Sequence, residues 1–160
     1  MGSLVSLAVL ALLAACECGK KPKKAVSSPP QVAVVEDNSF VGSAADFIAN
    51  AGDRVYFAYD KSNLSKEAEI TLDRQVAWLK HHETKKILVE GHCDERGTRE
   101  YNLGLGERRT DAVAKHFLAN GISGQRVRTI SYGKDRPVAA LGSTEEIHQL
   151  NRVAISVVED

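Results

Sequence analysis

The sequence has no surplus of either charge, because 21 lysines and arginines stand against 21 aspartates and glutamates. Proteins that bind nucleic acids mainly through electrostatics carry a basic surplus, so we expect no nucleic-acid partner. The 160 residues allow one globular domain and a tail. With 43% hydrophobic and 26% charged residues, the composition is that of an ordinary globular domain.

The first part of the chain is apolar, but its hydrophobic run is shorter than the roughly 20 residues that a membrane-spanning helix requires. Residues 4–15 contain Ser6 as their only polar residue, a length that suits the apolar part of a secretory signal peptide. The run ends in Leu13-Ala14-Ala15-Cys16. This ending resembles the bacterial lipobox, in which small residues precede a cysteine that receives a lipid. We therefore expect residues 1–15 to be a lipoprotein signal peptide and Cys16 to be the lipidated residue.

Basic residues are absent from residues 1–15, although the start of a secretory signal usually carries Lys or Arg. A start codon placed too late, or a truncated sequence, would explain this absence. The first six residues also fit the N-myristoylation pattern, with Gly2 as the acceptor. That pattern is short and leaves the apolar run and the lipobox unexplained, so lipidation of Cys16 remains the prediction.

The next segment has no hydrophobic periodicity. Residues 17–31 contain four lysines and three of the four prolines of the chain. This composition is typical of a disordered, flexible linker with extended Pro-rich stretches. We therefore predict a lipidated N-terminus and flexible tether over residues 16–43, followed by a globular domain over residues 44–160.

Cysteine is scarce, with only three in the chain. If Cys16 is lipidated, Cys18 in the tether and Cys93 in the domain remain. An oxidising compartment would permit a disulfide between them. Because Cys93 lies at the end of an apolar strand pattern, a buried free thiol is the favoured interpretation.

Common catalytic and metal-binding motifs are missing. There is no Walker loop, His-Glu-x-x-His motif or nucleophile elbow, and Gly104-Leu105-Gly106 lacks the third glycine of a dinucleotide-binding turn. No third metal ligand lies at motif spacing from His81-His82, so no metal and no cofactor are expected. A Cys93-dependent hydrolase is a minor alternative. Adjacent residues of an extended segment point to opposite faces, so His92 and Cys93 do not readily form a base–nucleophile pair.

Periodicity and turn residues predict the secondary structure of the domain. Ser65 and Thr98 are suited to begin two helices that extend to about residues 82 and 120, and Gly121 to end the second. Alternation of strands and helices predicts an α/β (α+β) domain with helices on one sheet, but it does not give the strand order. Strands are expected at residues 46–49, 55–58, 86–90, 127–132 and 153–158, with a short helix after a capping box at 143–146.

The block GHCDERGTREYNLGLGERR, residues 91–109, is the most specific motif of the chain. It resembles the signature of the OmpA-like peptidoglycan-binding domain family, in a form similar to that of the lipoproteins of the Tol–Pal system. Residues 55–60, 131–134 and 151–152 support the resemblance, which covers about residues 44–158. It implies a two-layer OmpA-like sandwich, with helices packed on one face of a mixed four-stranded sheet.

The resemblance also implies a binding site for the peptidoglycan stem peptide, held by the zwitterionic end of its diaminopimelate side chain. By motif position, Asp94 would accept the ammonium group and Arg109 would bind the carboxylate. A surface ion pair on the helix is the alternative for Arg109. The resemblance places Tyr59 and Asp60 on a neighbouring loop and Asn102 and Leu105 on the helix side of the cleft, although Asn102 could instead hold the loop through backbone hydrogen bonds.

The family further implies a protein that is not an enzyme. Its lipid would lie in the outer membrane and its domain would face the periplasm, where it would tether the membrane to the cell wall. Tol–Pal proteins also bind TolB and act in envelope integrity and cell division. An OmpA-like envelope lipoprotein that is not coupled to Tol is the main alternative.

Overall fold

The computed structural model describes residues 40–139 and 142–159. The predicted signal peptide, Cys16, Cys18 and nearly all of the predicted tether lie outside these residues. Within the described ranges, no helix has both the length and the apolar character needed to span a membrane.

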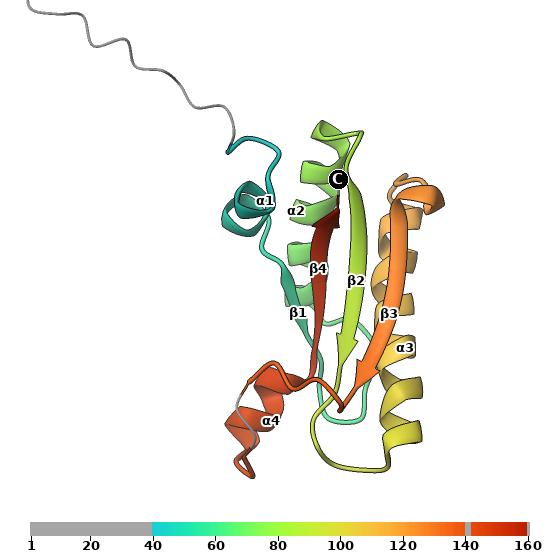
Figure 1. The fold of residues 1–160 in the computed structure, drawn as a ribbon. Coiled ribbons are helices and arrows are strands. Elements are labelled where there is room, and N and C mark those ends of the chain that lie inside the picture. Colours follow the sequence, from blue (N-terminus) through green and yellow to red (C-terminus); the bar gives the residue numbers. More distant parts are fainter. Residues whose placement is uncertain (1–39, 140–141, 160) are drawn as a thin grey trace, which may run out of the picture. The chain divides into compact units, whose positions relative to one another are not determined.

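Four strands form one mixed sheet (Figure 1). They are β1 (Arg54–Tyr56), β2 (Lys86–His92), β3 (Val127–Gly133) and β4 (Val153–Glu159). The order across the sheet is β1-β4-β2-β3; β2 and β3 are parallel, while β4 is antiparallel to both β1 and β2. The last strand of the sequence thus inserts between the first two, a feature that the sequence pattern did not give.

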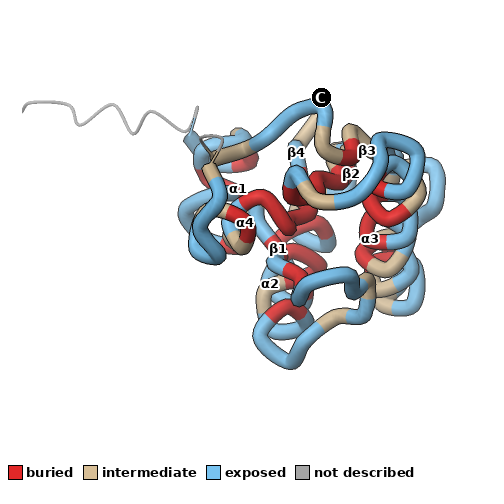
Figure 2. The backbone as a smooth tube through the Cα atoms, turned by 90° about the horizontal axis from the view of Figure 1, so that it is seen from below, coloured by how far each residue is buried: buried red, intermediate tan, exposed pale blue. Residues whose placement is uncertain are grey.

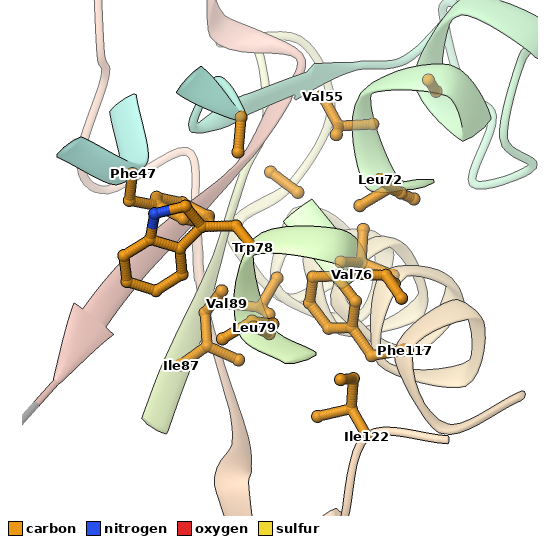
Figure 3. Packing of buried hydrophobic residues seen from close by; sticks show 14 of the residues in the cluster. Phe47, Val55, Leu72, Val76, Trp78, Leu79, Ile87, Val89, Phe117 and Ile122 are labelled. Atoms are coloured by element: carbon orange, nitrogen blue, oxygen red, sulfur yellow. The ribbon is translucent and has the colours of Figure 1, made fainter. Parts of the chain in front are cut away.

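Two long helices cover one face of the sheet, α2 (Lys66–His81) and α3 (Arg99–Ala119), as Figure 2 shows from the end. The shorter helices are α1 (Ala44–Asn50) and α4 (Glu145–Asn151). The predicted two-layer fold is confirmed. The core lies between the helices and the sheet (Figure 3), and its largest fully buried members are Phe47, Phe57, Leu72, Leu79, Ile87 and Phe117.

The predicted ends of the long helices are confirmed. The Ser65 side chain accepts a hydrogen bond from Ala68 N, and the Thr98 side chain accepts one from Tyr101 N. Each bond satisfies a backbone N–H that has no partner within the first turn of the helix. Gly121 follows α3 with a φ of 88°, in the left-handed region that favours glycine.

The strand predicted at residues 46–49 is wrong, because these residues belong to α1. A stretch of four residues, Asp46 to Ala49, is too short to distinguish the period of a helix from that of a strand. The Ser43 side chain begins the helix by accepting from Asp46 N. The Asp46 carboxylate in turn accepts from Trp78 Nε1, at 2.9 Å, and Phe47 packs edge-on against the Trp78 ring. A contact with α2 therefore decides the conformation of this segment.

Two smaller differences concern element ends. Strand β1 stops at Tyr56, although Phe57 N still donates to Arg152 O at 2.9 Å. The short helix α4 begins one residue later than a capping box at Ser143 would give, because Thr144 is its N-cap and accepts from Ile147 N.

Helix α3 lies unusually close to β2 and β3 at two glycines. A Cβ atom added to Gly106 would lie 2.1 Å from Ser131 Oγ, and one added to Gly91 would lie 2.5 Å from Gly106 O. A side chain at either position would push the helix away from the sheet. These glycines thus have a packing role, and the close approach brings the N-terminal half of α3 beside the loop that follows β2.

Candidate functional site

A pocket of about 230 Å³ lies at the end of the sheet where β1 and β2 finish and β4 begins. Its wall combines the segment after β1, the loop 93–98 after β2, the first half of α3, and Arg152. All six residues predicted as ligand contacts line it, so the fold brings together positions that are up to 50 residues apart. The lining residues are Tyr59, Asp60, Cys93, Asp94, Arg96, Gly97, Tyr101, Asn102, Leu105, Arg109 and Arg152.

Arg109 is fully buried on the pocket side of α3, with an exposed fraction of 0%. Its Nε donates to Lys61 O at 2.9 Å, Nη1 to His92 O at 2.9 Å, and Nη2 to Ala58 O at 3.3 Å. A surface ion pair is therefore the wrong interpretation of this arginine. Burial lowers the pKa of the guanidinium, and the nearby Cys93 and Asp94 oppose that change. Within residues 40–139 and 142–159 its direct hydrogen-bond partners are neutral, so no carboxylate of this part of the chain is bonded to this buried cation.

Asp94 lies at the start of the loop after β2 and is only 5% exposed. Its Oδ2 accepts hydrogen bonds from Arg96 Nε and Arg152 Nη1, both at 3.2 Å, and also from Arg96 Nη2. Burial alone would raise the pKa of the carboxyl group, but the bonds from Arg96 and Arg152 outweigh it and hold the pKa below its usual value. Asp94 is therefore an ionised acceptor that already has two arginine partners.

Arg152 is a pocket residue that the sequence prediction missed. It precedes β4, is 4% exposed, and donates to Asp94 Oδ2, to Glu145 Oε1 at 2.7 Å and to Phe57 O at 3.2 Å. The Asn151-Arg152 pair was part of the family resemblance, which was the available signal. Its pairing with Asp94, 58 residues earlier, depends on the insertion of β4 between β1 and β2, because Asp94 lies directly after β2.

Aromatic and acidic side chains form the exposed rim of the pocket. The Arg96 guanidinium lies 4.1 Å from the centre of the Tyr59 ring, and the Tyr101 hydroxyl donates to Asp60 Oδ1. Asp60 has a φ of 55°, uncommon for a residue other than glycine, which turns the chain sharply after β1. The rim can therefore offer ring faces and a carboxylate to a ligand.

The loop 93–98 is held by hydrogen bonds to its backbone. Asn102 Nδ2 donates to Arg96 O at 2.7 Å and to Thr98 O at 3.0 Å, and Lys134 Nζ donates to Gly97 O at 2.6 Å. Of the two roles considered for Asn102, loop fixation is therefore the one that the structure shows. These bonds hold residues 96–98 of the loop that carries Asp94.

Cys93 is a buried free thiol, as the sequence predicted. Its Sγ lies 3.4 Å from Arg109 Nη1, whereas the neighbouring His92 ring contacts Arg136 O, at 2.8 Å from Nδ1. Burial raises the pKa of the Cys93 thiol, so the nucleophilic thiolate is disfavoured. These positions give the hydrolase alternative neither an activated nucleophile nor an adjacent base.

The chemistry of the pocket is that of charge recognition. Three arginines and two aspartates line it, in a space large enough for the end of a charged side chain. In residues 40–139 and 142–159, no group of three or more His, Cys, Asp or Glu side chains gathers in a way that could hold a metal ion. The arrangement suits a ligand end that carries a carboxylate, with an ammonium group beside it.

Comparison with known sequences gives a consistent result. The model of the OmpA family matches residues 56–151. A peptidoglycan-associated lipoprotein of Mesorhizobium japonicum is 44% identical over 139 residues, which cover 84% of this chain and 80% of the relative. A protein of the same name from Rhizobium meliloti is 40% identical over 154 residues, covering 96% and 86%.

Comparison with solved structures agrees. The crystal structure of the peptidoglycan-associated lipoprotein from Burkholderia pseudomallei superposes with a TM-score of 0.66 at 34% sequence identity. The match covers 78% of this chain and 98% of that one.

Proposed function

Because this chain belongs to the OmpA family and its relatives over most of its length are named peptidoglycan-associated lipoproteins, we propose that it binds peptidoglycan without covalent bonds and tethers the outer membrane to the cell wall. In this proposal the domain holds the stem peptide, and lipid on Cys16 holds the chain in the membrane. The relatives bear the name of a lipoprotein and not of an enzyme, so the activity proposed is binding alone.

The observation that carries the proposal is the unpaired buried cation beside a buried carboxylate. Among the described residues, Arg109 has neutral hydrogen-bond partners only, and Asp94 lines the same pocket. A carboxylate that reaches Arg109 would pair with a charge that is already desolvated, which makes the interaction stronger than at the surface. The pocket is thus better matched to an anionic group with an adjacent cation than to a neutral chain.

The diaminopimelate side chain ends in this combination of groups. Its terminal carboxylate would face Arg109, and its ammonium would face Asp94. Tyr59 and Asp60 on the rim and Leu105 on α3 would contact the remainder of the ligand. Neutral residues of the stem peptide lack the paired charges, so the proposal assigns the pocket to diaminopimelate.

Partner binding is the second half of the proposal. The resemblance to the Tol–Pal lipoproteins suggests TolB as a partner, with a role in envelope integrity and cell division. A pull-down with purified TolB tests this half separately. Failure of the domain to capture TolB, with wall binding intact, would favour an envelope lipoprotein that is not coupled to Tol.

Co-sedimentation with purified sacculi tests wall binding. We expect Asp94→Asn and Arg109→Gln, which each remove one charge, to lower the affinity by a factor of about 30 or more, because losing one partner of a buried charge pair costs roughly 2–5 kcal/mol. Matched controls are Asp111→Asn and Arg108→Gln, which remove the same charges from exposed positions on α3. Cys93→Ala should still sediment with sacculi.

Folding must be checked in the same experiment, because Arg109 is fully buried. Circular dichroism melting identifies any variant that is unfolded at the assay temperature, and only folded variants are compared. Wild-type affinity in both folded pocket variants would overturn the assignment of the site.

A further inference from the structure

Asp94, the carboxylate proposed to receive the ligand ammonium, already forms an ion pair with Arg96. Arg96 donates two side-chain hydrogen bonds to Asp94 Oδ2, and its backbone N–H donates to Oδ1 at 3.3 Å. Arg96 also lines the pocket, between Asp94 and the Tyr59 ring. A ligand ammonium and the Arg96 guanidinium would therefore compete for one acceptor.

The two arginines on Asp94 differ in how firmly they are held. Arg152 is almost fully buried and has further bonds to Phe57 O, Glu145 and Gln149. The Arg96 side chain is 35% exposed, and its other partners lie at the surface: the Tyr59 ring and Glu145, whose side chain is 61% exposed. Surface ion pairs and exposed cation–π contacts are weak. Arg96 is thus the partner that can leave.

The net charge of the pocket also favours displacement of Arg96. With Arg96 in place, the lining carries three arginines against two aspartates, and the excess positive charge opposes an incoming ammonium. Without Arg96 the remaining arginines and aspartates balance, which suits a ligand end that is itself a zwitterion. The displaced guanidinium keeps Glu145 as a neighbouring acceptor.

We propose that Arg96 is a displaceable counter-ion that occupies the ammonium position of the empty pocket and is exchanged for the ligand's ammonium on binding. This inference rests on the proposed function, since it assumes that the ligand brings an ammonium to Asp94. Arg96 then weakens the binding of a ligand with a free ammonium, which must displace the guanidinium, whereas a ligand without one leaves Arg96 on Asp94.

The test compares wild type with Arg96→Gln by calorimetric titration of a soluble stem tetrapeptide that contains diaminopimelate. We expect the variant to bind about tenfold more tightly, the factor that a surface ion pair and a cation–π contact together represent. The same peptide acetylated on the side-chain amine should gain nothing from the substitution. Arg99→Gln is the matched control, because Arg99 pairs with Asp135 outside the pocket and carries the same charge.

A second measurement uses the unaltered protein. The Nε–H resonance of Arg96 should shift and exchange faster with water when the tetrapeptide is added, while that of Arg152 should stay protected. Equal or weaker binding by Arg96→Gln, or an unchanged Arg96 resonance in saturated wild type, overturns the exchange and leaves the peptide site standing. If neither wild type nor variant binds the tetrapeptide, the proposed function fails and the exchange fails with it.

Discussion

The hydrophobic core and two arginines of the pocket, Arg109 and Arg152, are buried to nearly the same extent but with opposite chemistry. In the core, Phe117, Leu79 and Ile87 are fully buried and need only apolar neighbours (Figure 3). In the pocket, Arg109 and Arg152 are almost equally buried, and each is surrounded by oxygen acceptors. Burying an ion without such partners would destabilise the fold by several kcal/mol.

The difference lies in what each region requires of its neighbours. The core requires only apolar side chains of the right volume, because apolar contacts have no preferred direction. The pocket requires specific partners at hydrogen-bond distance, and these come from the segment after β1, the last residue of β2, the loop that follows β2, and α4. Substitutions in the core should therefore change stability alone, whereas substitutions in the pocket should change stability and affinity together.

The largest effect is expected in the core, from Phe117→Ala. Removing a fully buried ring leaves a cavity, so we expect the free energy of unfolding to fall by about 3–5 kcal/mol. Urea denaturation measures the loss, and the neighbouring Leu118→Ala, on the exposed side of α3, is the control. Sacculus binding by the folded fraction should stay at the wild-type level; weaker binding would show that core and pocket are not separable.

The next largest effect is expected from Arg152→Gln, which should lower both the stability of the fold and the affinity for sacculi. Asp94 loses one of two arginine partners and keeps Arg96, so we expect a loss of about 2–3 kcal/mol in stability, below the range for an ion left with no partner. Affinity for sacculi should fall as well, because the Asp94 carboxylate is no longer held in place. Arg128→Gln, which breaks only a surface pair with Glu159, should change stability by less than about 0.5 kcal/mol. Unchanged affinity in folded Arg152→Gln would mean that this arginine, like the core residues, contributes to stability and not to binding.

The same contrast explains how much the sequence could predict. Helical spacing and N-caps at Ser65 and Thr98 located the core helices, since these signals are local. The residue pattern after β2, by resemblance, located Asp94 and Arg109. Arg152 was missed because its partner lies 58 residues away and meets it only through the insertion of β4. Residues 46–49 were misassigned because Trp78, on another helix, fixes their conformation.

The pH dependence of stability should reveal the contribution of the Asp94 carboxylate. The folded-state pKa of Asp94 is lowered, so its contribution to stability is present above the unfolded value of about 3.9 and is lost as pH falls through the folded value. Each unit of depression corresponds to about 1.4 kcal/mol. The difference in unfolding free energy between wild type and Asp94→Asn, measured with urea from pH 6 to pH 2.5, should narrow toward the acid end. A constant difference across this range would mean that Asp94 does not titrate differently on folding.

The smallest effect is expected at Lys134, which holds the loop 93–98 without touching the proposed ligand site directly. Its Nζ donates to Glu95 O at 3.2 Å and to Gly97 O at 2.6 Å. Lys134→Met removes both bonds from a partly exposed group, so stability should change little. Affinity for sacculi should fall about threefold to fivefold, because the loop that positions Asp94 gains freedom that binding must then remove. Lys134→Arg should restore most of the affinity, since the guanidinium can donate to both carbonyls, whereas Lys80→Met on α2 should change nothing. Equal affinity of Lys134→Met and wild type would mean that Asn102 alone fixes the loop. A loss of stability without a loss of affinity would mean that Lys134 contributes to the fold and not to binding.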